Sequence, residues 1–169
     1  MSFDATSWTK GRKKIHLIGI AGSGMTPLAD IFVDLGHEVT GSDLKEAPER
    51  LRDRGVRIAI GHRAENLGSA EVVIASGAVP DTNPEWTEAG RKGIPRLRRT
   101  EVLAQLASLK KLVAVLGSHG KTTTSTMLAH IWKEAGQEPC FYLGGSAPSL
   151  GASGANASAP SALPALCLP

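Results

Sequence analysis

Two stretches of this sequence each combine an apolar run, a glycine-rich loop and a helix-like segment, and this pattern restricts the chain to α/β folds. The stretches cover residues 14–35 and 112–136. A nearly continuous apolar run is typical of a strand buried in a parallel sheet. A glycine loop between such a strand and a helix directs backbone N–H groups and the positive helix end toward an anion. The sequence therefore predicts two turns suited to phosphate groups.

The second loop carries the stronger signal. Its Gly120-Lys121-Thr122 triplet is typical of a nucleotide phosphate clamp, although Val115 stands where the full Walker pattern has a glycine. Lys121 is predicted to hold the β- and γ-phosphates, and the Thr122 hydroxyl to bind Mg²⁺. The alternative is an ordinary strand-to-helix turn with an exposed lysine.

The first loop departs from the dinucleotide fingerprint. Gly19 and Gly24 match its first and last glycines, but Ala21 fills the middle position and the extra glycine is Gly22. Asp43 follows about twenty residues later, where an acid can accept a hydrogen bond from a ribose hydroxyl. These features favour a nucleotide-type ligand. In the alternative, the glycines serve only close packing of helix on strand, and Asp43 caps the next helix.

Composition excludes several classes. The chain has 169 residues, a formal net charge of +3 and 4% aromatic residues. The basic residues of 91–99 have no aromatic platform beside them, so we expect no nucleic-acid partner. Cys140 and Cys167 form neither a metal-binding spacing nor a disulfide framework. Because no run of about eighteen apolar residues occurs, we expect a cytoplasmic protein without membrane contact.

Strand and helix patterns alternate along the chain, which predicts a mostly parallel sheet with right-handed crossovers. The expected strands are 14–20, 38–40, 57–60, 72–76, 94–97 and 112–116, and the expected helices include 25–35, 47–54, 84–92 and a helix over 100–107 capped by Thr100. In such a sheet, ligands gather at the carboxyl ends of the strands. Both glycine loops fall at such ends, together with Ser42, Asp43, His62 and the turn that begins at Ser76.

Five segments, in this order, resemble the Mur ligase family. They are residues 15–25, 36–43, 61–67, 76–85 and 117–123, and the resemblance extends over about residues 15–145. It is strongest to the branch that joins L-alanine to UDP-N-acetylmuramate. His119 before the Gly-Lys-Thr triplet is also a feature of the sister branch that recycles murein tripeptide, so this branch is an alternative.

The resemblance implies a Rossmann-like, UDP-sugar-binding domain over residues 1–108 and the beginning of a P-loop ATP-binding domain over residues 109–145. The first domain would hold the uridine diphosphate end of the substrate. The implied substrate-binding residues are Gly19, Ile20, Ala21, Gly22, Ser23, Gly24, Met25, Ser42, Asp43, His62, Ser76, Gly77 and Ala78.

The resemblance also implies ATP and Mg²⁺ as cofactors. The implied ATP-binding residues are Gly117, Ser118, His119, Gly120, Lys121, Thr122 and Thr123. Lys121 and His119 would be catalytic, and Thr122 would bind the metal. In the family's reaction, phosphorylation of the muramyl carboxylate gives an acyl phosphate that the alanine amine attacks. Phosphoryl transfer mostly requires positioning and charge neutralisation.

The sequence departs from the family after about Gly145. Residues 146–169 form a low-complexity tail, and no Asp, Glu, Lys or Arg follows Glu138. An out-of-frame translation beyond about Leu150 is one hypothesis, and a natural flexible tail is the alternative. A complete ligase would continue through further domains, so we expect this chain to be inactive alone and to expose apolar surface around residues 112–136.

Two other functions remain open at this point. A nicotinamide-dependent oxidoreductase would explain the first loop and Asp43, but not Lys121 and Thr122. A non-catalytic UDP-sugar-binding module would bind nucleotide at the first loop without turnover.

Overall fold

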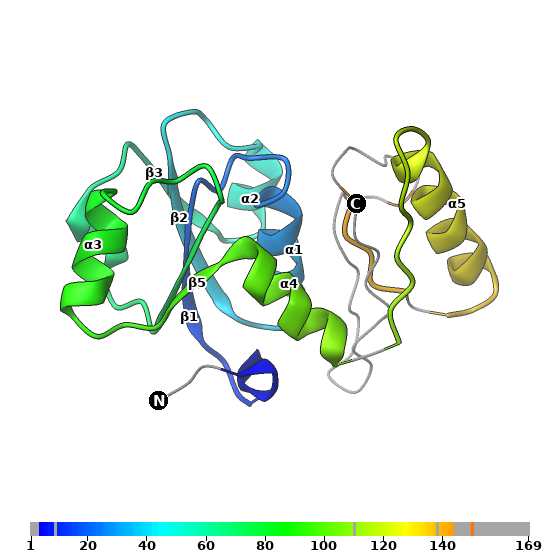
Figure 1. Ribbon diagram of the computed structural model, residues 1–169, viewed down its shortest axis with the longest axis horizontal. Helices are drawn as coiled ribbons and strands as arrows, with labels where there is room; N and C mark the ends of the chain where they lie inside the picture. Colours follow the sequence, from blue (N-terminus) through cyan, green and yellow to red (C-terminus); the bar gives the residue numbers. More distant parts are fainter. Residues whose placement is uncertain (1–3, 9, 110, 138, 144–149, 151–169) are drawn as a thin grey trace.

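The chain folds around a five-stranded parallel sheet with the strand order β3-β2-β1-β4-β5 (Figure 1). The computed structural model describes residues 4–8, 10–109, 111–137, 139–143 and 150. The strands are β1 (Lys14–Ile18), β2 (Glu38–Asp43), β3 (Arg57–Ile60), β4 (Val72–Ala75) and β5 (Arg96–Arg98). This sheet confirms the predicted α/β class.

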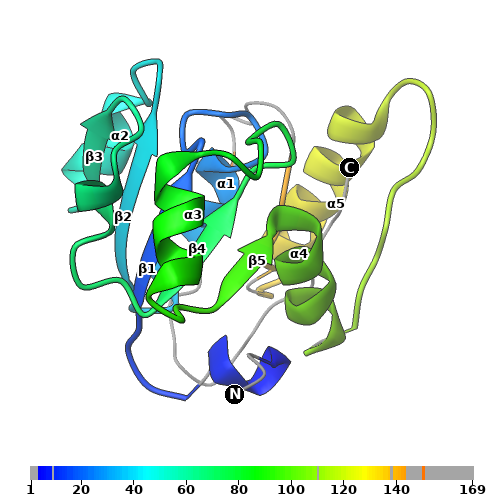
Figure 2. The ribbon, with the colours of Figure 1, turned by 60° about the vertical axis from the view of Figure 1, so that its left-hand side comes forward.

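Helices cover the two faces of the sheet unequally. The α-helices are α1 (Thr26–Asp34), α2 (Glu49–Asp53), α3 (Pro84–Arg91), α4 (Arg99–Ser108) and α5 (Lys121–Glu134), and the 3-10 turns are η1 (Ala5–Trp8) and η2 (Ala64–Leu67). Helices α1, α2 and α4 lie on one side of the sheet and α3 on the other (Figures 1 and 2).

Alternating side chains of the central strands build a core on each face. In β1, Ile15 and Leu17 pack with residues of α1, α2 and α4, whereas Ile18 packs with Trp86 and Ala89 of α3. These β1 side chains are at most 1% exposed. Burial on both faces explains why the strand sequences are nearly continuous apolar runs.

Local sequence explains where α3 and α4 begin. Asn83 caps α3, because its side-chain oxygen accepts hydrogen bonds from the backbone N–H groups of Glu85 and Trp86, and Pro84 occupies the first helical position. The predicted Thr100 cap of α4 is wrong. The helix begins one residue earlier, where the Glu101 carboxylate accepts a hydrogen bond from the Arg98 N–H and satisfies that donor.

The predicted strand over residues 112–116 is also wrong. No strand is assigned there, and Leu112, Val113 and Leu116 are 40%, 36% and 80% exposed. The sheet ends at β3 and β5 and does not extend to this segment. A buried strand is stable only with strand neighbours and helices to cover it, and sequence pattern alone cannot provide them.

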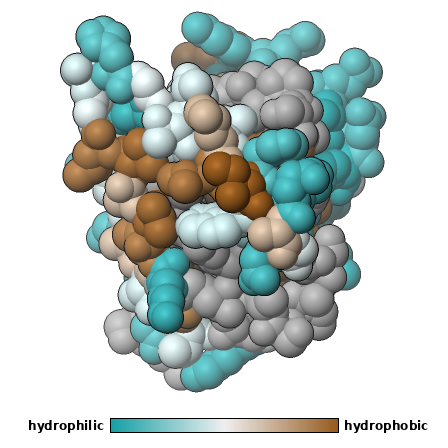
Figure 3. All heavy atoms as spheres, turned by 90° about the vertical axis from the view of Figure 1, so that its right-hand side faces the viewer, coloured by the Kyte–Doolittle hydropathy of each residue, from teal (hydrophilic) through white to brown (hydrophobic). Residues whose placement is uncertain are grey.

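We refer below to residues 14–109 as the sheet region and to residues 111–137 and 139–143 as the P-loop region. The helix predicted after Lys121 is present as α5, where Ala129 is buried against Phe141 and Leu143. The predicted exposure of apolar surface is confirmed at Leu116 and on α5 (Figure 3). Among the described residues, no helix combines the length and apolarity needed to cross a membrane. Apart from Leu150, the predicted tail lies outside the described residues.

Candidate functional site

The end of β2 holds the first glycine loop in place. The Ser42 carbonyl accepts hydrogen bonds from the N–H groups of Gly19 (2.8 Å) and Ile20 (3.1 Å), and the Asp43 carboxylate accepts one from the N–H of Ala21 (2.9 Å). Gly19 has a φ of +84°, which an L side chain rarely adopts. The structure therefore brings the predicted loop and the predicted Ser42-Asp43 pair together.

Asp43 does not cap the next helix, so that part of the alternative is wrong. Its second carboxylate oxygen accepts a hydrogen bond from the Lys45 N–H at 3.0 Å, whereas the cap position of α2 is Pro48. A carboxylate accepts more than two hydrogen bonds. Asp43 can therefore shape the loop and still accept a ligand hydroxyl.

Gly41 in β2 allows the loop to lie directly on the strand. A Cβ atom at this position would lie 2.6 Å from Ile20 Cδ1 and 2.8 Å from the Leu17 carbonyl oxygen. Gly41 was not among the predicted site residues. A glycine inside an apolar strand does signal close backbone approach.

A buried carboxylate organises the neighbouring part of the site. Glu85 of α3 is 0% exposed. One oxygen, Oε2, accepts a hydrogen bond from Ser42 Oγ at 2.5 Å, and the other, Oε1, accepts from Asn66 Nδ2 at 2.5 Å and from the Arg63 N–H at 3.1 Å. His16 Nε2 lies 3.4 Å from Oε2. This one side chain therefore links β1, β2, the loop before η2 and α3.

The hydrogen bonds keep Glu85 ionised. Burial alone would raise its pKa, but hydrogen bonds from His16, Ser42 and Asn66 outweigh burial and hold the pKa below its ordinary value. His16 also contacts Thr40 Oγ1 at 2.8 Å. His16 thus has a structural role.

The same network orients His62. Ser42 uses its only hydroxyl proton on Glu85, so it accepts a hydrogen bond from His62 Nδ1 at 2.9 Å. Nδ1 therefore carries a proton, and Nε2 is the nitrogen left for other partners. The His62 side chain is 18% exposed, and its Nδ1 lies 3.6 Å from Glu85 Oε2. His62 is a half-buried, pre-oriented polar group beside the end of β2.

The turn after β4 forms another wall. The Ser76 N–H donates to the Ile18 carbonyl at 3.1 Å, and a Cβ atom on Gly19 would lie 3.1 Å from Ser76 Cβ. Gly77 and Ala78 are exposed. All the predicted substrate-binding segments therefore converge at the carboxyl ends of β1, β2, β3 and β4, as expected for a ligand site in a parallel sheet.

The second glycine loop has a geometry suited to an anion. Gly120 has a φ of +77° and precedes the fourteen-residue helix α5. Lys121 Nζ folds back onto the loop, where it donates to the carbonyls of Gly117 (2.7 Å) and Ser118 (3.2 Å). The loop residues are exposed. A cation and a helix N-terminus thus meet at an open loop, and this arrangement fits nucleotide phosphates.

Other predicted residues of this loop lie close by. His119 is exposed, and its Nδ1 lies 3.2 Å from Ser118 Oγ. Thr122 and Thr123 are exposed in the first turn of α5. Within the described part of the chain, no group of three or more His, Cys, Asp or Glu side chains could hold a metal ion.

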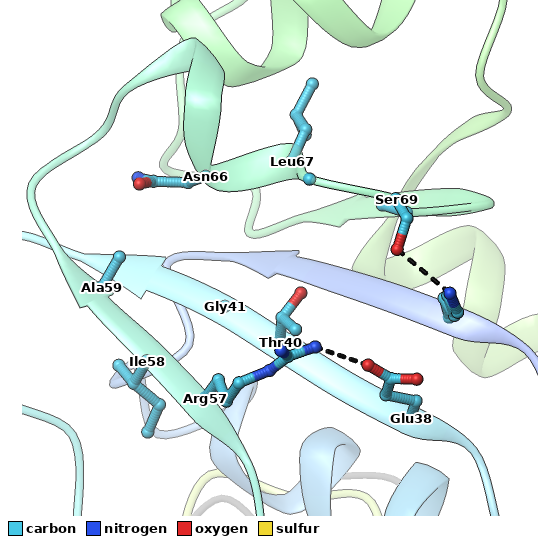
Figure 4. Close-up of a pocket in the computed structure, with 12 residues that line it drawn as sticks. Glu38, Thr40, Gly41, Arg57, Ile58, Ala59, Asn66, Leu67 and Ser69 are labelled. Carbon is cyan, nitrogen blue, oxygen red and sulfur yellow. Dashed lines mark hydrogen bonds and ion pairs between the residues drawn. The ribbon is translucent and has the colours of Figure 1, made fainter.

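A pocket of about 370 Å³ lies elsewhere, on the face of the sheet beside η2 (Figure 4). Its charged lining residues, Lys14, Glu38 and Arg57, lie at the starts of β1, β2 and β3, whereas Gly41 and Asn66 line its end nearer to the predicted site. Its charged groups already have partners, because Lys14 donates to Ser69 Oγ at 3.2 Å and Arg57 pairs with Glu38. We assign this pocket no role.

Three residues of the site or its surroundings were not predicted from the sequence. They are Glu85, Arg99 and Tyr142. Glu85 stands in the Asn-Pro-Glu segment that contributed to the family resemblance, and Arg99 and Tyr142 contact Gly24 from distant parts of the chain. Burial of a charged side chain is not visible in sequence. The Asn-Pro helix start two residues earlier was the available signal for Glu85.

Comparison with known proteins shows the family of the chain. Residues 14–111 match the family described as the Mur ligase family, catalytic domain. The UDP-N-acetylmuramate--L-alanine ligases of Rubrobacter xylanophilus and Aquifex aeolicus are 47% and 50% identical to the chain over 140 and 141 residues. Each match covers 82% of this chain and 31% of the relative.

Solved structures give the same result. UDP-N-acetylmuramate-alanine ligase from Thermotoga maritima matches with a TM-score of 0.76 and 36% identity, over 85% of this chain and 36% of that one. The UDP-N-acetylmuramate:L-alanyl-gamma-D-glutamyl-meso-diaminopimelate ligase from Neisseria meningitides matches with a TM-score of 0.79 and 28% identity, over 93% of this chain and 52% of that one. The chain thus spans about a third of the length of its curated relatives, and the family match covers the whole sheet region. The chain belongs to the Mur ligase family.

Proposed function

We propose that the whole protein is an ATP-dependent ligase that joins L-alanine to the carboxylate of UDP-N-acetylmuramate. The convergence of the Gly19–Met25 loop, Ser42, Asp43, His62 and the Ser76 turn at one edge of the sheet carries this proposal. The names of the curated relatives support the choice of reaction. In this chain, the activity to test is binding, because the chain spans only part of its relatives.

The sheet region would bind the uridine diphosphate end of the substrate. Backbone N–H groups of the loop from Gly19 to Met25 would donate to the diphosphate. Asp43 would accept a hydrogen bond from the nucleoside, since it has acceptor capacity beyond Ala21 and Lys45. His62 would present Nε2 to the ligand, with its ring held by Ser42.

The P-loop region would bind ATP. Lys121 would exchange the Gly117 and Ser118 carbonyls for phosphate oxygens, and Thr122 would contact Mg²⁺. His119 would donate a hydrogen bond to phosphate or substrate. When bound, ATP would activate the muramyl carboxylate by phosphorylation. The residues of this chain would then serve mainly to position charges, which is the main requirement of phosphoryl transfer.

Calorimetric titration of the purified chain tests the substrate assignment. We expect UDP-N-acetylmuramate to bind, and we expect Asp43→Ala to abolish binding without unfolding the chain. Asp53→Ala is the matched control, because Asp53 is exposed at the end of α2. A folded wild-type chain that binds NADH but not UDP-N-acetylmuramate would refute the proposal in favour of the oxidoreductase alternative.

The tripeptide-recycling reaction is the second candidate, supported by the structural match to the Neisseria meningitides ligase. The higher identity to curated L-alanine ligases favours alanine. A phosphate-release assay on the whole protein distinguishes the two candidates. The assay contains UDP-N-acetylmuramate and either L-alanine or murein tripeptide as the amine, and its control omits UDP-N-acetylmuramate. Release with tripeptide alone would favour the recycling reaction.

A further inference from the structure

The guanidinium group of Arg99 lies against the first glycine loop. A Cβ atom on Gly24 would lie 1.7 Å from Arg99 Nη1 and 2.8 Å from Arg99 Cζ. Only a residue without a side chain leaves room for the guanidinium at this point. Arg99 is the first residue of α4, far from the loop in sequence, and it is half-buried.

Tyr142 fixes the guanidinium in this position. Its hydroxyl donates to the Gly24 carbonyl at 2.7 Å and accepts from Arg99 Nη1 at 2.8 Å. Tyr142 is 1% exposed, and this burial raises the pKa of its hydroxyl, although Arg99 opposes the change. The hydroxyl therefore keeps its proton at neutral pH and can make both bonds.

The charge of Arg99 is not neutralised locally. Within the part of the chain that the structure describes, Arg99 forms no ion pair, and its recorded side-chain hydrogen bond is the one to Tyr142. The adjacent Arg98 differs, since it pairs with Asp81, donates to the Val79 carbonyl at 2.8 Å and lies 4.2 Å over the Trp86 ring. A guanidinium has five N–H donors, so Arg99 retains most of its donors for another partner.

We propose that Arg99 is a ligand of the substrate's diphosphate, held at the Gly19–Met25 loop by Tyr142. This inference rests on the proposed function and adds a side-chain cation to the backbone N–H groups of the loop that are proposed to bind the diphosphate. The planar guanidinium can donate two parallel hydrogen bonds to phosphate oxygens. A half-buried setting strengthens such a charge interaction relative to water.

The test compares UDP, UMP and uridine as calorimetric probes of the full chain. We expect Arg99→Gln to raise the Kd for UDP about ten- to a hundredfold, as for a lost charged hydrogen bond. The change should be smaller for UMP and absent for uridine. Arg91→Gln is the matched control, because Arg91 is exposed on α3 and pairs with Glu88. Equal weakening for all three probes would indicate a merely structural role and overturn the inference.

Two further variants test the geometry. Gly24→Ala should displace the guanidinium and reproduce the phosphate-selective loss, whereas Tyr142→Phe should weaken UDP binding only a few-fold because the cation remains. The Kd of Arg99→Lys for UDP should fall between those of the wild type and Arg99→Gln, because the positive charge remains but the planar pair of guanidinium donors is lost. Unchanged UDP affinity in Arg99→Gln would overturn this inference alone. A folded wild-type chain that binds neither UDP nor UDP-N-acetylmuramate would overturn the proposed function as well.

Discussion

The apolar runs before the two glycine loops begin from similar sequence patterns and reach different structures. In the sheet region, the run becomes β1, and Leu17 is 0% exposed between β2 and β4. In the P-loop region, the run stays outside the sheet, and Leu116 is 80% exposed. Both runs nevertheless lead to a glycine with positive φ and then to a helix.

This difference separates local from non-local determinants. A glycine turn and a helix form from nearby residues, so both regions have them. A buried strand takes its hydrogen bonds and its apolar contacts from distant segments, and the described P-loop region forms no such strand. A strand-like sequence therefore predicts a strand only where neighbouring segments are available to pair with it. A glycine loop followed by a helix-like sequence nearly suffices to predict that turn and helix.

The two regions also meet where Tyr142 bonds to Gly24 and Arg99 and where Cys140 and Tyr142 pack in the core of the sheet region. Tyr142 follows α5, which starts at the second glycine loop, and Gly24 belongs to the first glycine loop. A substrate that orders the first loop can thus affect the segment packed on α5. Substitutions in each region can measure whether the sheet region is more stable than the P-loop region.

Glu85→Ala should have the largest effect on stability. Removing the carboxylate leaves buried His16 and Ser42 without their shared partner, which should cost about 3–5 kcal/mol. Chemical denaturation followed by tryptophan fluorescence measures this loss. A cost below about 1 kcal/mol, typical of a surface site, would contradict the organising role of Glu85.

Lowering the pH should destabilise the fold through the same carboxylate, Glu85. Because the folded-state pKa of Glu85 lies below its ordinary value, its ionisation stabilises the fold above that value. This stability is lost as the pH falls through the lowered pKa. Glu85→Gln keeps the shape and removes the titration, so its stability should depend less on pH than that of the wild type between neutral and strongly acidic pH. Parallel pH curves for the two proteins would refute this assignment.

The matched pair Leu17→Ala and Leu116→Ala tests the comparison directly. Both leucines belong to the apolar runs that precede the glycine loops, but Leu17 is buried and Leu116 is exposed. Leu17→Ala should cost about 2–5 kcal/mol by leaving a cavity. Leu116→Ala should stay within about 0.5 kcal/mol of the wild type. Similar losses in the two variants, measured by denaturant titration, would show that the P-loop run is packed in solution.

Much of the fold was predictable because its strands are buried and nearly continuous. The boundaries of β3 were predicted as observed, and those of β1, β2, β4 and β5 differ by a few residues. The end of β2 was missed because Gly41 and Ser42 are typical of turns, yet Gly41 is required by the contact with Ile20. The error at residues 112–116 arose because a sequence pattern does not reveal which neighbours are available.

The candidate site was predictable where strand ends and glycines mark it. The convergence of Ser42, Asp43 and His62 at the first loop follows from parallel topology alone. Glu85 and Arg99 were not predictable in the same way. Their roles depend on which side chains of α3 and α4 reach the loop, and this depends on tertiary packing.

A smaller loss of stability is expected when a glycine with no room for a Cβ atom is replaced by alanine. Gly41→Ala places a methyl group 2.8 Å from the Leu17 carbonyl oxygen, where the backbone must move, and should cost about 1–3 kcal/mol. Gly77→Ala is the control, because no atom lies within 4 Å of its Cβ position. Thermal unfolding of both variants checks this. Equal melting temperatures would contradict the close contact between the first loop and β2.

The smallest effect on stability is expected on the outer face of α5, together with a clear effect on association. Met127 and Ile131 are 61% and 59% exposed and lie one helical turn apart. Replacing both with Gln should change stability by no more than about 0.5 kcal/mol per site. Exposed apolar surface promotes association, so the wild-type chain should self-associate with rising concentration in light scattering, and the double variant should do so less. A wild-type chain that stays monomeric at all concentrations would show that the P-loop region covers this face in solution, and the contrast between the two regions would then be smaller than the structure indicates.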